Sequence, residues 1–455
     1  MTLVRELSDF LKAKKNYFIP GMILLLVGCE AASDKNIGQT AITKWQGNKK
    51  AAISITFDDG IVNQLTVARP ILNKLGMPGT FYIITGKVEG SGQGKFIGRS
   101  KDEIIRESAT ITTNTDNFFE RASLIGFTGT SEGLDYHSTA GSLFESGKIK
   151  EAYEVIDEAY SKLRKGELKD SDEVVYHDNK IDTTSWNDYG SYAAEGHEIG
   201  SHTVTHARLA VLDEANLLYE LQQSKADIQK NLGEKYTFSA ECPYGTENER
   251  VMQYATTIYP ALRNRMPAPY LEEINRSGDL APGASDKEYV QWQRGPLTDT
   301  SMEMMQSWVD TCLVRDNIWL VLVFHGVDGI GWESKTEEEL FTYFNYIKEK
   351  DKDLWVATFG DVAKYIRERK SMEISNTVKD NSIEINLSSS LDPKVYDVPL
   401  TLKTYVPGNW KNVVLKENSA QSILSVLTLE KDVAGSYVEY TVSPGISQLV
   451  LMDEL

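Results

Sequence analysis

The sequence predicts an α/β domain built on a parallel sheet or barrel, followed by a small all-β sandwich. Over residues 50–370, short strand-like runs alternate with helix-like segments. Such repeats build parallel sheets whose functional sites lie at the carboxyl ends of the strands. Over residues 371–455, short apolar runs are separated by Asn, Gly, Pro and Ser, which is typical of a sandwich. A chain of 455 residues is long enough for two or three domains.

Hydrophobic periodicity and helix-ending residues define the elements of the first domain. Residues 51–57 (AAISITF) alternate as a strand, and the helix expected over 67–76 ends at a glycine. In the helix over 213–233, Asp213 can cap the first turn. The run IWLVLVFHG is apolar enough for a strand that is buried on both faces. Further strands are expected at 79–84, 236–245 and 354–359, and further helices at 248–259, 300–314, 337–350 and 360–369.

Residues 87–185 do not follow this alternation. They contain an amphipathic helix near 148–166 between polar and acidic stretches. We expect them to form an insertion near the entrance of the site. A solvated helical decoration without a functional role is the alternative.

The first residues resemble the signal peptide of a bacterial lipoprotein, over residues 1–28. Three lysines precede the run YFIPGMILLLVGC, which is too short to span a membrane. Its end, LVGC, resembles the lipobox, in which the cysteine carries the lipid. We therefore expect a membrane anchor at Cys29, a polar tether over 29–49 and a location at the bacterial cell envelope, periplasmic or cell-surface. An uncleaved anchor or a buried strand is the alternative.

Charge and cysteine content exclude some classes of protein. The formal net charge of −18 argues against a nucleic-acid partner, because nucleic-acid binding requires a basic face. With Cys29 lipidated, Cys242 and Cys312 remain, and they could form one disulfide but no disulfide framework. Stability then depends on the hydrophobic core.

Two adjacent carboxylates, Asp58 and Asp59, stand where the strand ISITF ends. They repel each other unless a cation or a division of roles relieves the repulsion, although a solvated Asp-Gly turn is the simpler reading. His202 and His206 in HTVTH have a spacing that lets two imidazoles close on one ion, as on a helical turn. Two imidazoles and one carboxylate would form an open metal site. The second carboxylate would then be free to act as a base.

The motifs TFDDG, HTVTH, CPYG and LVFH, in this order, resemble those of the polysaccharide deacetylases, which are carbohydrate esterase family four with its NodB homology domain. The resemblance covers roughly residues 50–368. It implies a distorted (β/α) barrel with seven strands that removes O- or N-linked acetyl groups from an acetylated polysaccharide. It also implies a divalent metal, usually Zn²⁺, with Co²⁺ or Ni²⁺ as alternatives.

The resemblance assigns a role to each motif residue. Asp58 would be the catalytic base, and His325 the general acid toward the leaving group. Asp59, His202 and His206 would hold the metal. Tyr244, which follows Pro243, would offer its backbone N–H to the oxyanion. Trp332 lies in the loop after His325, and we expect it to stack on a sugar ring. The remaining histidines, His137, His177 and His197, are assigned to structure, and core packing is expected of Trp186, Trp292 and Trp319.

The chain departs from the family at two motifs. Where the family has R-x-P-Y, this chain has Glu241-Cys242-Pro243-Tyr244, so the arginine that holds the catalytic aspartate is missing. Arg263 or Arg265 could replace it, or Asp58 could be oriented differently. An inward-pointing Glu241 would raise the pKa of Asp58. The motif D-x-x-D-W, which tunes the acid histidine, is also absent.

These departures leave an alternative from another class. The chain could be a carbohydrate-binding lipoprotein without turnover, with the barrel and the sandwich forming its binding surface. A glycosidase is less favoured, because no further pair of acidic residues is marked out for that role.

Overall fold

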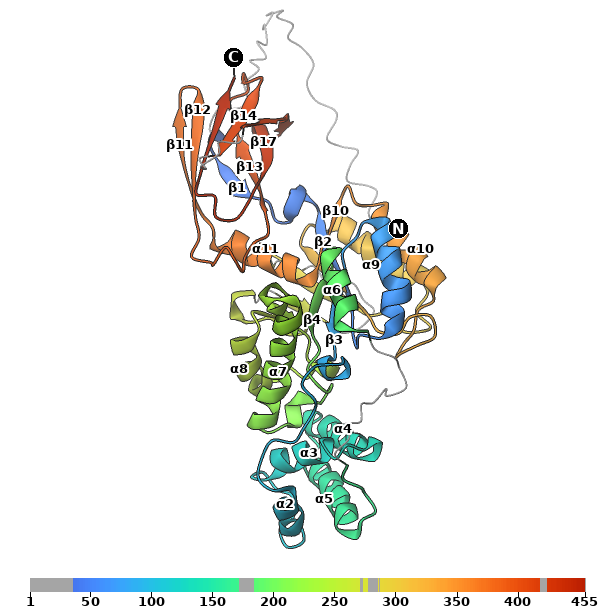
Figure 1. Ribbon diagram of the computed structural model, residues 1–455. Coiled ribbons are helices and arrows are strands. Elements are labelled where there is room, and N and C mark those ends of the chain that lie inside the picture. Colours follow the sequence, from blue (N-terminus) through green and yellow to red (C-terminus); the bar gives the residue numbers. More distant parts are fainter. Residues whose placement is uncertain are drawn as a thin grey trace, which may run out of the picture.

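The computed structural model describes residues 36–171, 184–270, 273–276, 285, 287–417 and 424–454. The predicted signal peptide, Cys29 and His177 lie outside these residues, so the lipid anchor stays a prediction. Three parts follow one another in space: a β-sandwich, a central α/β domain and a group of helices (Figure 1). Within the described ranges, the helices are too short or too polar to cross a membrane.

A parallel sheet of nine strands forms the central domain. β10 (Leu354–Val356) pairs with the first residues of β2 (Ala51–Phe57), whereas β3 pairs with the last ones. Two strands therefore share one edge of β2, which distorts the sheet. The remaining strands pair in the order β6 (Ala261–Leu262), β5 (Ser239–Ala240), β4 (Glu198–Ser201), β3 (Thr80–Ile83), β2, β9 (Ile318–Phe324), β8 (Val290–Arg294), β7 (Glu273–Asn275).

This sheet, with nine strands, differs from the distorted seven-stranded barrel that the family resemblance implies. Among the described residues no pairing joins β6 to β7, so the sheet is a curled half-barrel with two free ends. The strand expected over 236–245 is also shorter, and only Ser239–Ala240 pairs as β5. Beyond β5 the chain turns, and Tyr244 adopts a left-handed conformation, with φ of 61°.

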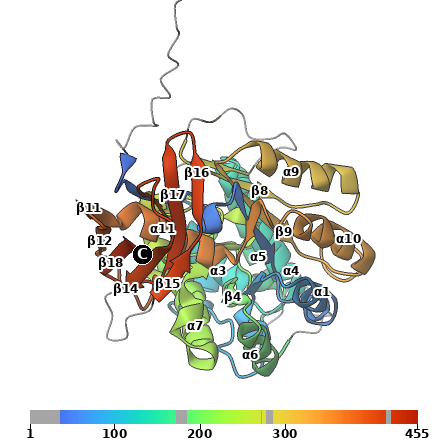
Figure 2. The ribbon, with the colours of Figure 1, turned by 90° about the horizontal axis from the view of Figure 1, so that it is seen from above.

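Side-chain alternation along β2 determines which residues face the two sides of the sheet. Ile53, Ile55 and Phe57 pack against the helices on the outside. Ser54 and Thr56 face the other way, where they bond to Trp319 and Arg263. Asp58 continues this inner row. Figure 2 shows the outer helices around the strands: α1 (Arg69–Leu75), α6 (Trp186–Ala194), α7 (Glu214–Leu232), α9 (Met302–Val314) and α10 (Glu337–Lys348).

The segment expected to be an insertion contains a helical bundle with an apolar core of its own. It has four helices, α2 (Lys101–Glu107), α3 (Phe118–Gly126), α4 (Ser131–Glu145) and α5 (Ile149–Lys165). The amphipathic pattern predicted only the last of them. In the central domain, α8 (Glu249–Ile258) packs beside α7.

Two antiparallel sheets form the sandwich, which follows α11 (Phe359–Ser371). One sheet has the order β11 (Glu373–Lys379), β12 (Ser382–Ser388), β18 (Gln448–Asp453), β14 (Val413–Glu417), β15 (Leu424–Leu427). The other has the order β1 (Thr40–Ile42), β13 (Leu400–Tyr405), β17 (Gly435–Val442), β16 (Leu429–Asp432).

The strand β1 differs from the polar tether expected over 29–49 within its own residues, whereas residues 29–35 lie outside the described part of the chain. Thr40 lies opposite Thr404, and their hydroxyl oxygens are 2.9 Å apart. The backbone of this segment thus completes one edge of the sandwich before the chain enters the central sheet. Cys242 and Cys312 are both buried and free, so they do not form the single disulfide that the sequence allowed.

Glu368 on α11 makes stability depend on pH. Burial raises its pKa from 4.5 to about 8. One of its oxygens accepts the Val398 N–H at 3.1 Å, and the other has no hydrogen-bond partner in the described part of the chain. Because the folded protein favours the protonated acid, this contribution to stability is complete below pH 4.5 and is lost as the pH rises through 8. We expect Glu368→Gln to reduce the fall in melting temperature between pH 5 and 9.

Thermal unfolding across that pH range measures the effect. The exposed Glu338→Gln is the matched control and should follow the wild type. Identical pH profiles for wild type and Glu368→Gln would contradict this role of Glu368.

Candidate metal centre and active site

A pocket of about 780 Å³ opens at the carboxyl ends of the strands. The side chains that line it come from loops far apart in the sequence, after β2, β4, β5 and β9. Ser138 of α4 also lines the pocket, which places the helical bundle at its wall. The predicted site residues in the lining are Asp58, Asp59, His202, His206, Tyr244, His325 and Trp332, whereas Pro243 is buried and is not part of the lining.

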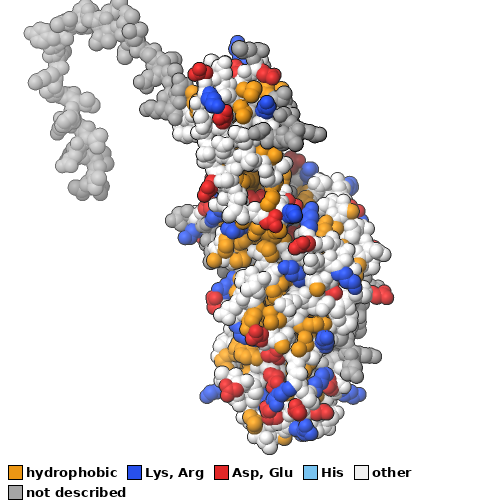
Figure 3. Space-filling model, turned by 60° about the vertical axis from the view of Figure 1, so that its left-hand side comes forward, with side chains coloured by type: hydrophobic (Ala, Val, Ile, Leu, Met, Phe, Trp, Pro, Cys, Tyr) orange, Lys and Arg blue, Asp and Glu red, His pale blue; other side chains and the backbone are white. Residues whose placement is uncertain are grey.

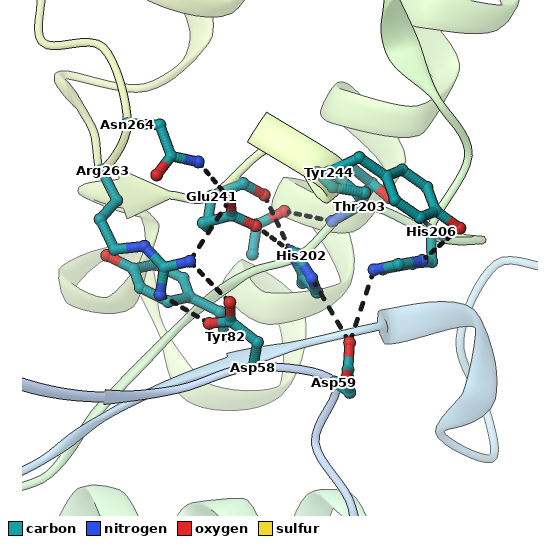
Figure 4. Close-up of polar contacts among 12 residues, drawn as sticks. Asp58, Asp59, Tyr82, His202, Thr203, His206, Glu241, Tyr244, Arg263 and Asn264 are labelled. Atoms are coloured by element: carbon teal, nitrogen blue, oxygen red, sulfur yellow. Dashed lines mark hydrogen bonds and ion pairs between the residues drawn. The ribbon is translucent and has the colours of Figure 1, made fainter. Parts of the chain in front are cut away.

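Asp59, His202 and His206 form a group that fits a divalent metal (Figure 4). The Nε2 atoms of both histidines lie 3.5 Å from Oδ1 of Asp59. Ligand atoms about 2.0–2.1 Å from one tetrahedral ion lie roughly 3.4 Å from each other, so the spacing matches such a site. One carboxylate and two imidazoles also match the donors that zinc and similar ions take, with a position left open.

The two histidines stand on a tight loop, not on the helical turn that their spacing suggested. Thr203 and His206 have φ of 66° and 63°, in the left-handed region that non-glycine residues seldom occupy. Asp59, with φ of 75°, is strained in the same way. Such strain costs on the order of 1–3 kcal/mol per residue and persists only where the surroundings enforce it.

The buried Glu220 on α7 enforces the conformation of this loop. Its carboxylate accepts the N–H groups of Val204 and Thr205 at 2.9 and 2.8 Å, and the Thr205 hydroxyl at 2.7 Å. The sequence analysis did not identify this residue. An acidic side chain beside Leu221, on the apolar side of an amphipathic helix, is the signal that could have revealed it.

The second nitrogen of each metal-site histidine is also held. Nδ1 of His202 lies 2.6 Å from the carboxylate of Glu241 and 3.0 Å from its carbonyl oxygen. Nδ1 of His206 lies 3.2 Å from the hydroxyl of Tyr244. Partners of this kind fix ring orientation and tautomer, and they raise the affinity of the ligands for a metal. Glu241 therefore positions a candidate metal ligand.

A chain of contacts joins the helical bundle to His206. The guanidinium of Arg208 lies over the ring of Tyr244, 4.2 Å from its centroid. Nη1 of Arg208 is 2.6 Å from the carboxylate of Glu145, at the end of α4. The bundle thus supports the side of the pocket on which Tyr244 stands.

Asp58 lies beside the metal group and is held by Arg263 (Figure 4). The guanidinium forms two hydrogen bonds to the two carboxylate oxygens, at 2.7 and 2.6 Å, and both side chains are buried. Arg265 turns elsewhere and donates to the carbonyl oxygen of Glu247. Of the two arginines that the sequence offered, Arg263 therefore makes the contact with Asp58 that was expected of the motif arginine.

The electrostatics of Asp58 differ from the expectation for an inward-pointing Glu241. Burial by itself raises the pKa of Asp58, but the positive charges of Arg263 and His325 outweigh burial and lower the pKa below its usual value. Arg263 also lies 3.4 Å from Glu241 and shields Asp58 from this second carboxylate. Asp58 is therefore ionised near neutral pH.

His325 and Trp332 also line the pocket beside Asp58. Nε2 of His325 is 3.4 Å from Oδ2 of Asp58, and the ring of Trp332 stands edge-on to the imidazole at 4.7 Å. Trp332 is 57% exposed, so its indole is available to a ligand. By contrast, Trp292 and Trp319 are buried in the core. Trp186 is half-buried, and its indole N–H donates a hydrogen bond to the hydroxyl of Ser91.

Residues 46–110 and 144–258 match the family model described as polysaccharide deacetylase. This match supports a relationship between the chain and the polysaccharide deacetylases. The matched region contains the TFDDG, HTVTH and CPYG motifs and ends before His325. It omits 111–143, which include α3 and most of α4, so the deacetylase match does not extend over the wall formed by Ser138.

Individual proteins resemble the chain more distantly. A gellan lyase from Bacillus sp. is 29% identical over 252 residues, which are 50% of this chain and 10% of the lyase. The chain thus spans about a tenth of the length of that relative. Deacetylase PplD from Streptococcus pyogenes, solved with acetate, is 17% identical over 46% of this chain and 53% of its own, at a TM-score of 0.24.

The Xyl-CE4 domain of a multidomain xylanase, from the hindgut metagenome of Trinervitermes trinervoides, is 14% identical. It covers 69% of this chain and 90% of its own, at a TM-score of 0.32. At TM-scores this low, the structural comparisons do not establish a common fold.

Proposed function

We propose that the protein removes O- or N-linked acetyl groups from a polysaccharide by metal-dependent hydrolysis. The observation that carries the proposal is the placement of Asp58 in one pocket with the group Asp59, His202 and His206 and with His325. Base, metal ligands and acid thus converge although they come from three separate loops. The match to the polysaccharide deacetylase family supports the same reaction.

A divalent ion held by Asp59, His202 and His206 would supply a Lewis acid that polarises the acetyl carbonyl and acidifies water. Asp58 then accepts the proton of the attacking water, because Arg263 keeps it ionised and oriented. His325, whose Nε2 lies 3.4 Å from Oδ2 of Asp58, donates a proton to the departing sugar oxygen or nitrogen. The backbone N–H of Tyr244 is the proposed donor to the oxyanion, and the exposed indole of Trp332 is the proposed platform for a sugar ring.

A binding protein without turnover is the competing function. Its main support is Glu241 at the position of the motif arginine. Arg263 already makes the two hydrogen bonds that such an arginine supplies, so this support is weak.

Acetate release tests the proposed function. We expect residues 30–455, supplied with zinc, to release acetate from at least one member of a panel of acetylated xylans, chitin oligosaccharides, pectins and peptidoglycan fragments. A chelator should abolish the release, and zinc, cobalt or nickel should restore it. A protein that binds one ion per chain yet releases no acetate from any member would favour the binding-only alternative.

A further inference from the structure

Gln64 is a polar side chain inside the central domain. On the face of the molecule seen in Figure 3, acidic and basic side chains are interspersed where water can solvate them. Gln64 is only 1% exposed, so its amide needs partners within the protein. It begins a π-helical turn, Gln64–Ala68, which leads from the loop after β2 into α1. Such turns are rare and often accompany functional sites.

The side-chain hydrogen bonds of Gln64 reach two residues of the proposed active site. Nε2 donates to the backbone carbonyl oxygen of Asp58 at 2.6 Å and to that of His325 at 3.0 Å. Because carbonyl oxygens only accept hydrogen bonds, the nitrogen end of the amide faces them. Oε1 has no hydrogen-bond partner within the described part of the chain, so the two donated bonds account for a glutamine at this buried position. One amide group thus joins the expected base to the expected acid.

This contact lies where two neighbouring strands end. β2 and β9 pair in parallel, with Phe57 opposite Phe324. The N–H of Asp58 still donates to the carbonyl oxygen of Phe324 at 2.9 Å. The bonds from Gln64 hold the next carbonyl oxygen of each strand, those of Asp58 and His325, so the two strand ends stay together just beyond the ladder of the sheet.

The turn after Asp58 needs support because it is strained. Asp59 and Gly60 both have left-handed φ values, 75° and 67°. A residue other than glycine keeps that conformation only where its surroundings enforce it. The hydroxyl of Tyr189 donates to the carbonyl oxygen of Gly60 at 3.2 Å, and Gln64 holds the carbonyl oxygen of Asp58. The turn is thereby fixed at both of its ends.

We propose that Gln64 is a positioning residue, which holds the backbones of Asp58 and His325 together so that base and acid act on the same acetyl group. The inference rests on the proposed function for the roles of base and acid. Arg263 orients the carboxylate of Asp58, whereas Gln64 ties the backbone of Asp58 to that of His325. In the structure, Nε2 of His325 lies 3.4 Å from Oδ2 of Asp58. A displacement of about 1 Å between groups that act together can lower a rate by roughly 100-fold.

Turnover by Gln64→Met tests this role. Methionine has nearly the same length as glutamine but donates no hydrogen bond, so the change removes both bonds at once. On an acetylated glycan that the wild type hydrolyses, at saturating zinc, we expect kcat to fall about 10- to 100-fold. KM should stay near the wild-type value, because Gln64 lies outside the pocket lining.

A substrate whose leaving group needs no proton separates alignment from a general loss of structure. 4-Nitrophenolate is a weak base and departs without an acid, so hydrolysis of 4-nitrophenyl acetate requires the base but not His325. We expect Gln64→Met to slow this ester several-fold less than it slows the glycan. Damage to folding or to the metal site would slow both substrates alike.

Asn63→Leu is the matched control. The side-chain amide of Asn63 donates to the carbonyl oxygen of Val327, two residues after His325, at 3.0 Å. This change also removes an amide bond to the loop after β9, but it leaves Asp58 and His325 tied, so kcat should stay near the wild-type value.

Gln64→Asn is a second test at the same position. It keeps the amide on a side chain that is one methylene shorter and cannot span both carbonyl oxygens, so kcat should be intermediate between the wild type and Gln64→Met. Circular dichroism and zinc content should show that each variant is folded and binds its metal.

Hydrogen exchange measures the tie without turnover. In the zinc-free protein, peptides that contain Asp58 or His325 should exchange faster in Gln64→Met than in the wild type, because backbone segments that lose a tie open more often. In Asn63→Leu, the peptide that contains Asp58 should exchange as it does in the wild type.

The outcomes separate this inference from the proposed function. A wild-type kcat for Gln64→Met, an equal fall on the glycan and on 4-nitrophenyl acetate, an equal fall in Asn63→Leu, or a rise in KM alone would each overturn the positioning role. If the wild type releases no acetate from any substrate, the proposed hydrolase fails. Unchanged exchange in Gln64→Met would then overturn the tie as well, whereas faster exchange at both segments would leave it standing.

Discussion

Asp58→Asn is expected to abolish acetate release while the protein still binds its metal. Asparagine keeps the shape of the side chain but cannot accept the proton of water, and loss of a general base lowers rates by about 10²- to 10⁴-fold. The expected metal ligands Asp59, His202 and His206 are unchanged. Turnover at saturating zinc, combined with metal content measured by mass spectrometry, checks both halves of this prediction.

The adjacent carboxylate provides the control. Asp59→Asn makes the same chemical change one residue later and should lower affinity for the ion, because it removes the only carboxylate among the three expected ligands. Turnover in Asp58→Asn near the wild-type rate would contradict the role of base, as would loss of zinc from that variant. Circular dichroism should show that both variants are folded.

Arg263→Gln is expected to impair both stability and catalysis. The change removes both hydrogen bonds to Asp58 and leaves a buried carboxylate without its ion pair, which costs about 3–5 kcal/mol of the free energy of unfolding. Without the arginine, the effect of burial is opposed less strongly, so the pKa of Asp58 rises. A higher pKa leaves less of the base ionised at a given pH, so the acidic limb of the activity profile should move to higher pH.

Chemical denaturation and a pH–rate profile measure the two effects of Arg263→Gln. Arg265→Gln is the matched control, since that side chain bonds outside the pocket and its loss should change neither quantity. Arg263→Lys should recover part of the stability but not the paired geometry. A wild-type pH profile for Arg263→Gln would show that Arg263 does not position the base.

Local sequence patterns were sufficient for the elements that end at the site. The alternating run 51–57 is the strand β2, and the capped segment 213–233 contains α7, with Asp213 accepting the N–H of Asn216. Because parallel strands have their carboxyl ends at the same edge of the sheet, the residues that follow β2, β4 and β9 were expected to lie close together. The grouping of Asp58, Asp59, His202, His206 and His325 was therefore predictable from motif order.

Other parts of the fold gave no such local signal. β5 and β6 are two residues long, too short for a periodicity to be read, and β8 (VQWQR) carries polar residues that face the inside of the half-barrel. The strand β1 is recognisable only through its pairing with β13, more than 350 residues later.

The sequence by itself determined the family resemblance, the order of the motifs and the identity of the expected metal ligands. Only the tertiary structure decided which arginine holds Asp58. Arg263 and Arg265 are two residues apart, so strand alternation by itself would direct both side chains to the same face. They differ in how far they lie beyond the end of β6. The N–H of Arg263 still bonds to Ala240 of β5, which directs the side chain inward to Asp58, whereas Arg265 lies beyond the sheet beside Glu247. Periodicity reports which face of a strand is buried, but contacts between distant loops depend on how the strands pair.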